Sequence, residues 1–476
     1  MKQLRLDQLT FHPMSNAEPE CRLFSFEGRL YRGASGVKGH FLRGLWQQGV
    51  IQGLVEKGLF IETSLADLAV DGFDVVFEHR LLRFPSFPFE WCAEMLRAAA
   101  AHILQLSLEL DQHSLVLTDP HSWNVLFDGP RPLYIDLGSL TPTGEDPWPG
   151  HADFLRFSYY PLLLMSRGQA HLARWLLNDG YAGVLESEVR AVRRVRLARW
   201  ERSSRPAGRF SRLVKLLAPT ALHQTLKGAR QAARSAGRVM RPSAARRRGL
   251  LDRLGHRVAA MRFPEAESSW RDYADTMPAL DNRDSWTSKQ TSAAEILAAT
   301  RPRTVAEAGC NRGWYARLAA KRGSHVVAFD LDEPSVGRLF GDVSRDGLSV
   351  LPLIMNVMAP TPCRGVGRLQ APDAPTRMRA ELVFALALVH HLALAQNRTW
   401  DHIAEALSAF TESWLAVEWV PSEDEQLRLW PSAERPSYRL DCLEAALAER
   451  GLMPVRTLPS HPEPRVLVLF QRRSRP

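Results

Sequence analysis

The segment 304–330 constrains the fold of this chain more than any other part of the sequence. A short apolar strand is expected over 304–306, a glycine-containing turn follows, and a helix is expected from about 314 to 321. A second apolar strand, 325–329, ends at the acidic residue Asp330. Strands that alternate with helices in this way are typical of βαβ units in parallel sheets. We therefore expect an α/β domain in the C-terminal half of the chain.

The turn between this strand and this helix has the composition of a ligand-binding loop. Gly309 and Gly313 remove side chains where the backbone must approach a ligand, and the free N–H groups of the helix that follows suit a carboxylate. Asp330 ends the second strand, where an acid can accept hydrogen bonds from both hydroxyls of a ribose. The turn begins at Glu307 and is not G-x-G-x-x-G, which disfavours NAD. The alternative is a βαβ unit that binds nothing.

The same residues resemble the first motif and the ribose-binding acid of class I methyltransferases. This resemblance implies a Rossmann-like sheet with helices on both faces and S-adenosylmethionine as cofactor. Asn356, in "LPLIMNVMAPTP", stands where these enzymes often place an acid near the adenine. The cofactor-binding residues implied by the resemblance are Glu307, Gly309, Asn311, Gly313, Asp330 and Asn356.

Three further segments, "ALALVHHL", "AVEWVPSEDEQ" and "PSYRLDCLEAALAERG", resemble a narrower group. These are the methyltransferases similar to host-specific nodulation proteins, which are found among polysaccharide-modifying functions. The resemblance extends over nearly the whole chain. It implies O-methylation of a glycan, or of a hydroxyl on another small molecule.

Three residues near the expected ends of the fourth and fifth strands are candidates for catalysis. His390 and His391 fall where the transferred methyl group should lie, and one of them could act as a general base. Glu418, in "WLAVEWV", is a candidate substrate-side acid. The alternative for each is a structural role at a strand end. Methyl transfer needs alignment of the reacting atoms and exclusion of water, and no metal is required.

The N-terminal half contains a second motif, "LVLTDPHSWNVLFDGPRPLYIDLGSL". Its D-x-H-x-x-N and D-x-G elements resemble the catalytic segment of aminoglycoside-phosphotransferase-like kinases. By that resemblance Asp119 would be the base that orients a hydroxyl, while Asn124 and Asp136 would hold magnesium against the phosphates of ATP. The alternatives are a nucleotide-binding pseudokinase and a hairpin whose Asp and Asn residues cap turns.

The upstream segment departs from the kinase pattern at one position. Arg32 stands where a kinase has its phosphate-binding lysine, and Glu56 would be its helix partner. Arginine can pair with ATP phosphates but is not interchangeable with lysine there. Lys38 lies nearby, but the sequence does not place it.

Charge divides the chain unevenly. The 476 residues carry a net charge of +9, yet residues 190–250 alone carry +17 and the remainder about −8. We expect three regions: an α+β kinase-like domain over 1–185, a basic helical connector over 186–284 and the methyltransferase domain over 285–476. The connector is either a solvated linker or a surface for an anionic partner: an anionic lipid, a lipid-linked glycan, a nucleotide-linked sugar or RNA. Its few aromatic residues disfavour binding of single-stranded nucleic acid.

Cysteine usage and hydropathy indicate the compartment. The five cysteines are scattered without C-x-x-C spacing, which fits a reducing environment. The N-terminal stretch has no apolar core of signal-peptide length, and no apolar run is long enough to span a membrane. We expect a cytoplasmic protein, with peripheral association to a membrane left open.

The leading function is therefore S-adenosylmethionine-dependent methyl transfer. The alternatives are a bifunctional kinase–methyltransferase and a non-catalytic scaffold that binds nucleotide and cofactor. RNA methylation is a further alternative, which the basic segment permits.

Overall fold

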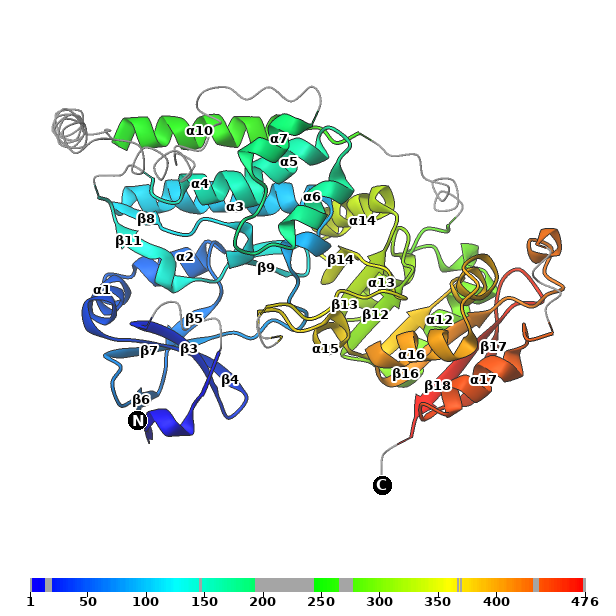
Figure 1. The fold of residues 1–476 in the computed structure, drawn as a ribbon. Helices are drawn as coiled ribbons and strands as arrows, with labels where there is room; N and C mark the ends of the chain where they lie inside the picture. The colour runs from blue at the N-terminus through cyan, green and yellow to red at the C-terminus, as the bar shows by residue number, and fades with distance from the viewer. Residues whose placement is uncertain are drawn as a thin grey trace, which may run out of the picture.

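The computed structural model describes residues 2–12, 19–144, 148–192, 244–264, 277–365, 368, 370–430 and 436–473. Figure 1 shows a C-terminal α/β body beside an N-terminal body with a small sheet and a group of helices. Among the described helices none is both long and apolar enough to cross a membrane.

A seven-stranded sheet forms the centre of the C-terminal body. Its strands are β12 (Thr304–Ala308), β13 (His325–Asp330), β14 (Val350–Ile354), β15 (Ala380–Ala385), β16 (Thr411–Trp419), β17 (Leu452–Pro459) and β18 (Val466–Arg472). The spatial order is β14-β13-β12-β15-β16-β18-β17. The first five strands of this order are parallel, and β18 runs antiparallel to both of its neighbours. The chain begins the sheet in the middle and then extends it in both directions, so the strand order reverses beside β12.

Helices cover both faces of this sheet because successive strand residues point to opposite sides. Val305 and Phe384 belong to one buried cluster, whereas their neighbours Ala306 and Val383 belong to the other. The helices are α12 (Ser288–Thr300), α13 (Trp314–Lys321), α14 (Glu333–Asp346), α15 (Ala374–Met378), α16 (Trp400–Phe410) and α17 (Leu440–Ala448). The predicted Rossmann-like arrangement is thereby confirmed, with the helix after the glycine turn at the predicted residues.

The N-terminal body begins with a five-stranded antiparallel sheet. Its order is β2-β3-β4-β7-β5, and a parallel pair, β1-β6, lies beside it. The strands are β1 (Lys2–Leu4), β2 (Thr10–Phe11), β3 (Cys21–Phe26), β4 (Arg29–Ala34), β5 (Thr63–Leu65), β6 (Leu68–Val70) and β7 (Val75–His79). Helices α1 (Gly36–Gln47) and α2 (Val50–Glu56) follow β4 in the chain.

A mostly helical part completes the N-terminal body. Its long central helix is α3 (Ala93–Gln112), which contacts two short two-stranded sheets, β9-β10 and β8-β11. The strands are β8 (Leu115–Leu117), β9 (Val125–Asp128), β10 (Arg131–Tyr134) and β11 (Leu140–Pro142), and the remaining helices are α4 (His151–Phe154), α5 (Tyr160–Met165), α6 (Ala170–Leu177), α7 (Glu186–Ala191) and α10 (Ala244–Ala260). This order agrees with the α+β expectation, and the kinase-like assignment stays a prediction.

The predicted connector boundaries, 186 and 284, differ from the structure. Helix α10 packs along α3 (Figure 1) because Leu251, Leu254 and Val258 form an apolar stripe that is buried. The buried guanidinium of Arg247 pairs with Asp111 at the same interface. These residues therefore belong to the N-terminal body. Residues 193–243, which carry most of the basic charge, lie outside the described residues.

The two bodies share one continuous apolar core. Helix α14 packs against α3, and the rings of Phe127 and Phe340 meet edge to face with centroids 6.0 Å apart. A buried ion pair crosses the same boundary: Arg377, on α15, contacts both carboxylate oxygens of Glu90 at 2.6 and 3.1 Å. The N-terminal body therefore packs directly against α14 and α15 of the C-terminal body.

Candidate active site

A cavity of about 1460 Å³ opens at the carboxyl ends of the parallel strands. It is lined by the segments that follow β12, β13, β14, β15 and β16, at the position where the strand order reverses. Ligands of open α/β sheets bind at this position, because loops on the two sides of the reversal diverge and leave a crevice. All six predicted cofactor-binding residues line the cavity.

The glycine turn is held against the second strand by backbone hydrogen bonds. The N–H groups of Gly309 and Cys310 both donate to the carbonyl of Phe329, at 2.9 and 3.2 Å. Gly309 and Gly313 have φ values of +70° and +63°, a region that favours glycine. A Cβ on Gly313 would lie 2.6 Å from the side chain of Leu339, so this glycine is required by helix packing as well as by the turn.

Asp330 links the turn to the end of β13. One of its carboxylate oxygens accepts a hydrogen bond from the N–H of Asn311 at 2.7 Å, and the other accepts from the N–H of Asp332 at 3.0 Å. The carboxylate has four lone-pair sites, more than its backbone donors use, so it can accept a further hydrogen bond from a ligand in the cavity. Burial raises the pKa of Asp330, although these backbone donors oppose the shift.

Glu307, on β12, and Asn356, in the loop after β14, both border the cavity. Glu307 accepts a hydrogen bond from the N–H of Ala316 at 2.7 Å, and burial raises its pKa to about 8. A cationic group of a ligand beside this carboxyl would therefore favour its ionised form. The side chain of Asn356 accepts from the N–H of Met358 at 2.9 Å, which fixes the loop after β14.

The two predicted histidines follow β15, which ends at Ala385, and lie where a short helical segment begins, with their ring centroids 4.1 Å apart. His390 is 5 % exposed, and its Nδ1 is buried without a hydrogen-bond partner among the described residues. His391 is more open, and its ring lies 5.3 Å from that of Trp430, another cavity residue. Burial lowers the pKa of both, to about 3 for His390, and the nearby cation Arg465 adds to the effect. Both rings are therefore neutral near pH 7.

The comparisons with known proteins point to a bacterial relative. No protein-family model matches the chain. The chain is 28 % identical over 468 residues to nodulation protein NoeA of Rhizobium meliloti (strain 1021), and the match covers 96 % of this chain and 94 % of that protein. The resemblance to nodulation proteins that the sequence indicates is thereby confirmed.

The C-terminal half has the α/β fold that the resemblance to class I methyltransferases implies. Its strand order with an antiparallel strand near one edge occurs together with the glycine turn and with Asp330 at the end of β13, in the arrangement that this resemblance implies. Solved structures that align with the chain include magnesium protoporphyrin IX methyltransferase from Synechocystis PCC 6803 with bound SAH, at 16 % identity over 38 % of this chain and 81 % of that one, TM-score 0.29. Another is the N-methyltransferase NodS from Bradyrhizobium japonicum WM9, at 13 % identity over 39 % of this chain and 94 % of that one, TM-score 0.30.

Glu418, predicted as a substrate-side acid, is not among the residues that line the cavity. Its side chain is completely buried in β16, where it accepts a hydrogen bond from the hydroxyl of Ser460 at 2.6 Å. Its other oxygen lies 2.6 Å from Nζ of Lys289, and it is Lys289 that lines the cavity. No sequence signal marks Lys289, because it precedes the glycine turn by a whole helix and strand.

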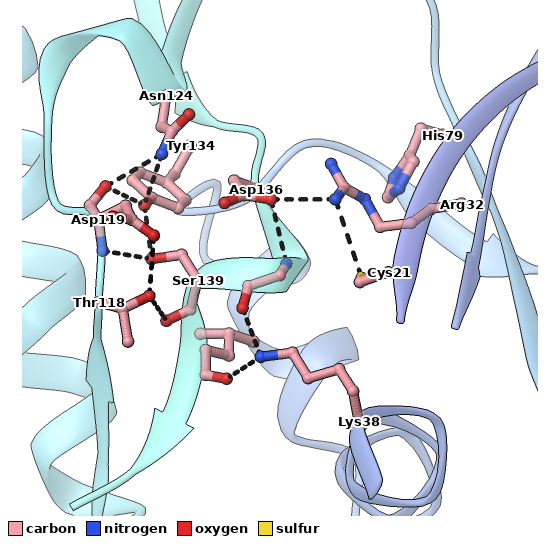
Figure 2. Close-up of polar contacts among 12 residues, drawn as sticks. Cys21, Arg32, Lys38, His79, Thr118, Asp119, Asn124, Tyr134, Asp136 and Ser139 are labelled. Atoms are coloured by element: carbon pink, nitrogen blue, oxygen red, sulfur yellow. Dashed lines mark hydrogen bonds and ion pairs between the residues drawn. The ribbon is translucent and has the colours of Figure 1, made fainter. Parts of the chain in front are cut away.

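The three predicted polar residues of the N-terminal motif, Asp119, Asn124 and Asp136, lie in one region of the structure, as Figure 2 shows. The side-chain amide of Asn124 donates to the backbone carbonyl of Asp119 at 3.0 Å, and the hydroxyl of Tyr134 donates to the same carbonyl at 2.7 Å. The hydroxyl of Ser139 accepts from the N–H of Asp119 at 3.0 Å. These bonds hold the loop in one conformation next to Asp136.

Two cations from the first part of the chain meet the loop that contains Asp136 (Figure 2). Arg32, on β4, lies 3.0 Å from a carboxylate oxygen of Asp136. Lys38, on α1, donates to the carbonyls of Gly138 and Leu140, the second at 2.7 Å. Glu56, the expected partner of Arg32, ends α2 as an exposed residue. The structure therefore places Lys38, which the sequence leaves unplaced, and pairs Arg32 with an acid from the other motif.

Proposed function

We propose that the methyltransferase domain transfers a methyl group from S-adenosylmethionine to a hydroxyl of a glycan or of another small molecule. The observation that carries this proposal is the direct hydrogen bond from the glycine turn to Asp330 inside the cavity at the strand ends. The turn and the acid form one unit that can hold the ribose of an adenosyl group. The sulfonium is an activated leaving group, so the protein must chiefly orient the methyl group and exclude water.

The charges around the cavity fit the amino-acid part of this cofactor. Glu307 offers a buried carboxyl to an ammonium group, and Lys289 offers N–H donors to a carboxylate. An ammonium ion has three donors, so Lys289 can bind an anion while it remains paired with Glu418. We propose that Lys289 binds the carboxylate of the cofactor's methionine part.

His391 is the group best placed to accept a proton from the acceptor hydroxyl. It lines the cavity, it is neutral near pH 7, and it is more open than His390, whose Nδ1 is enclosed by packing. Trp430 beside His391 offers a flat apolar wall, and Gln396 and Gln426 offer hydrogen-bonding amides nearby. A wall of this kind with adjacent amides supports an acceptor that carries several hydroxyls, such as a sugar.

Replacing Asp330 by alanine should weaken S-adenosylmethionine binding by about 10- to 100-fold, that is about 1.5–3 kcal/mol, because hydrogen bonds to a charged acceptor are lost. Asp330→Asn keeps one acceptor oxygen and should lose less. Isothermal titration calorimetry measures both constants. An Asp330→Ala variant that is folded and binds with unchanged affinity contradicts the assignment of the ribose acid.

Replacing both members of the buried pair, Lys289→Met with Glu418→Gln, should weaken binding of S-adenosylmethionine about tenfold or more. The double substitution avoids an uncompensated buried charge. Decarboxylated S-adenosylmethionine lacks the group that Lys289 is proposed to bind. Its affinity for the double variant should therefore be nearly the same as its affinity for the unmodified protein. Equal losses for both ligands, or none for either, would contradict the role of Lys289.

A non-catalytic scaffold remains the alternative from another class. It predicts cofactor binding without S-adenosylhomocysteine formation when pooled bacterial glycans and simple polyols are supplied. Cytoplasmic location and contact with an anionic lipid through residues 190–250 stay predictions, and most of that segment lies outside the described residues.

A further inference from the structure

The N-terminal motif resembles a magnesium-dependent phosphotransferase, so its residues can be tested for their fit to a metal ion. A magnesium ion needs carboxylate or carbonyl oxygens that are free to point at it in near-octahedral geometry. Among the described residues no group of three or more His, Cys, Asp or Glu side chains could hold a metal ion. The donor set that the resemblance implies, Asn124 and Asp136, contains a single carboxylate, so its fit to magnesium depends on whether Asp136 is available to bind the ion.

The contacts of Asp136 show why this site does not fit. The carboxylate oxygen nearest to Arg32 also accepts a hydrogen bond from the N–H of Gly138 at 3.1 Å. The side chains of Arg32 and Asp136 are only 10 % and 17 % exposed, so solvent screens their attraction weakly. A divalent cation bound to Asp136 would have to approach a guanidinium that already neutralises this acid.

The surroundings of Arg32 keep it in this position. It lies on a strand in the middle of the five-stranded sheet, and its guanidinium also lies 3.9 Å from the sulfur of Cys21. His79, on the adjacent strand, is buried beside it, and its pKa falls to about 3 through burial and the charge of Arg32. A neutral His79 places no second positive charge beside the guanidinium, so it does not compete with Arg32 for Asp136.

Lys38 provides a second attachment for the same loop. Its Nζ donates to two backbone carbonyls of the segment that follows Asp136. In this structure Lys38 therefore binds the loop itself. Arg32 and Lys38 both belong to the part of the chain that forms the five-stranded sheet and α1. Both bind the loop after β10, which belongs to the mostly helical part. Together they join the two parts of the N-terminal body across the place where a phosphotransferase would hold nucleotide and metal.

We propose that Arg32 is an internal cation that replaces the metal ion in the N-terminal domain, so that this domain performs no magnesium-dependent phosphoryl transfer. Its ion pair with Asp136 instead fastens the five-stranded sheet to the helical part. The domain then supports the methyltransferase domain, with which it shares a core.

The test uses the full chain and three variants: Arg32→Met, Asp136→Asn and the double variant. Each single substitution should lower the melting temperature by several degrees, and the double variant should melt no lower than the less stable single one, because both remove the same interaction. Lys2→Met is the matched control: it breaks an exposed ion pair with Glu27 on the same part of the chain and should change the melting temperature by less than the single variants do. Additive losses in the double variant would contradict a shared interaction.

The second measurement adds ligands to the unmodified protein. Magnesium chloride, ATP and ATP with magnesium are each compared with buffer containing EDTA, and phosphate release from ATP is followed. We expect no magnesium-dependent rise in melting temperature and no phosphate release above buffer. A magnesium-dependent stabilisation by ATP that is lost in Asp136→Asn would overturn the proposal and favour a bifunctional kinase–methyltransferase. Neither result depends on whether the methyltransferase domain is active.

Discussion

Replacing Arg377 by methionine should destabilise the protein by about 3–5 kcal/mol, because it leaves the carboxylate of Glu90 buried without its counter-ion. The two side chains are 3 % and 1 % exposed, and the guanidinium also donates to the carbonyls of Pro85 and Pro372 at 2.6 and 2.7 Å. The loss would fall on the interface between the two bodies, where the apolar core is continuous. Urea unfolding followed by tryptophan fluorescence and circular dichroism measures it.

Two further variants identify the origin of this effect. Adding Glu90→Gln to Arg377→Met removes the uncompensated charge and should recover part of the lost stability. Arg83→Met breaks an exposed pair with Glu412, in which the charged atoms are 3.6 Å apart, and should cost less than about 1 kcal/mol. If Arg377→Met and Arg83→Met have equal effects, the buried pair contributes no more to stability than an exposed pair.

Replacing His391 by alanine should lower the turnover of methyl transfer by about 10²- to 10⁴-fold, the usual contribution of a positioned general base. Cofactor affinity should change little, because the adenosyl group is held by the glycine turn and Asp330. His391→Gln keeps a polar side chain but cannot take up a proton at neutral pH, so its turnover should be as low. The measurement is S-adenosylhomocysteine formation, with calorimetry of cofactor binding alongside.

The pH profile provides a separate check on the same residue. The pKa of His391 is lowered, so the neutral form that can accept a proton persists below the ordinary value of 6.5. Turnover should therefore be level from about pH 8 to about pH 7 and should fall only as the pH drops below 6.5 and the ring gains a proton. A fall centred above pH 6.5 contradicts His391 as the base. His402→Ala, on the exposed face of α16, is the matched control and should retain full turnover.

The local features of the methyltransferase domain could be predicted from the sequence because they depend on neighbours in the chain. The turn from Gly309 to Gly313 requires positive φ angles, and the strand that ends at Asp330 is a continuous apolar run. Both are visible in the sequence, and a parallel strand order brings them together. The N-terminal D-x-H-x-x-N and D-x-G elements also lie together, since only a hairpin separates them.

Partners that are distant in the sequence are decided by the tertiary structure alone. Glu418 has the pattern of an acid at a strand end, yet it binds Lys289 from a helix more than a hundred residues earlier. Glu56 is the helix partner that the sequence suggests for Arg32, which instead meets Asp136. The helix 244–260 falls within the predicted connector, but its apolar stripe packs on α3. A sequence shows which side chains must be buried or paired, whereas the choice among several eligible partners depends on which surfaces the folded backbone brings within a few ångströms.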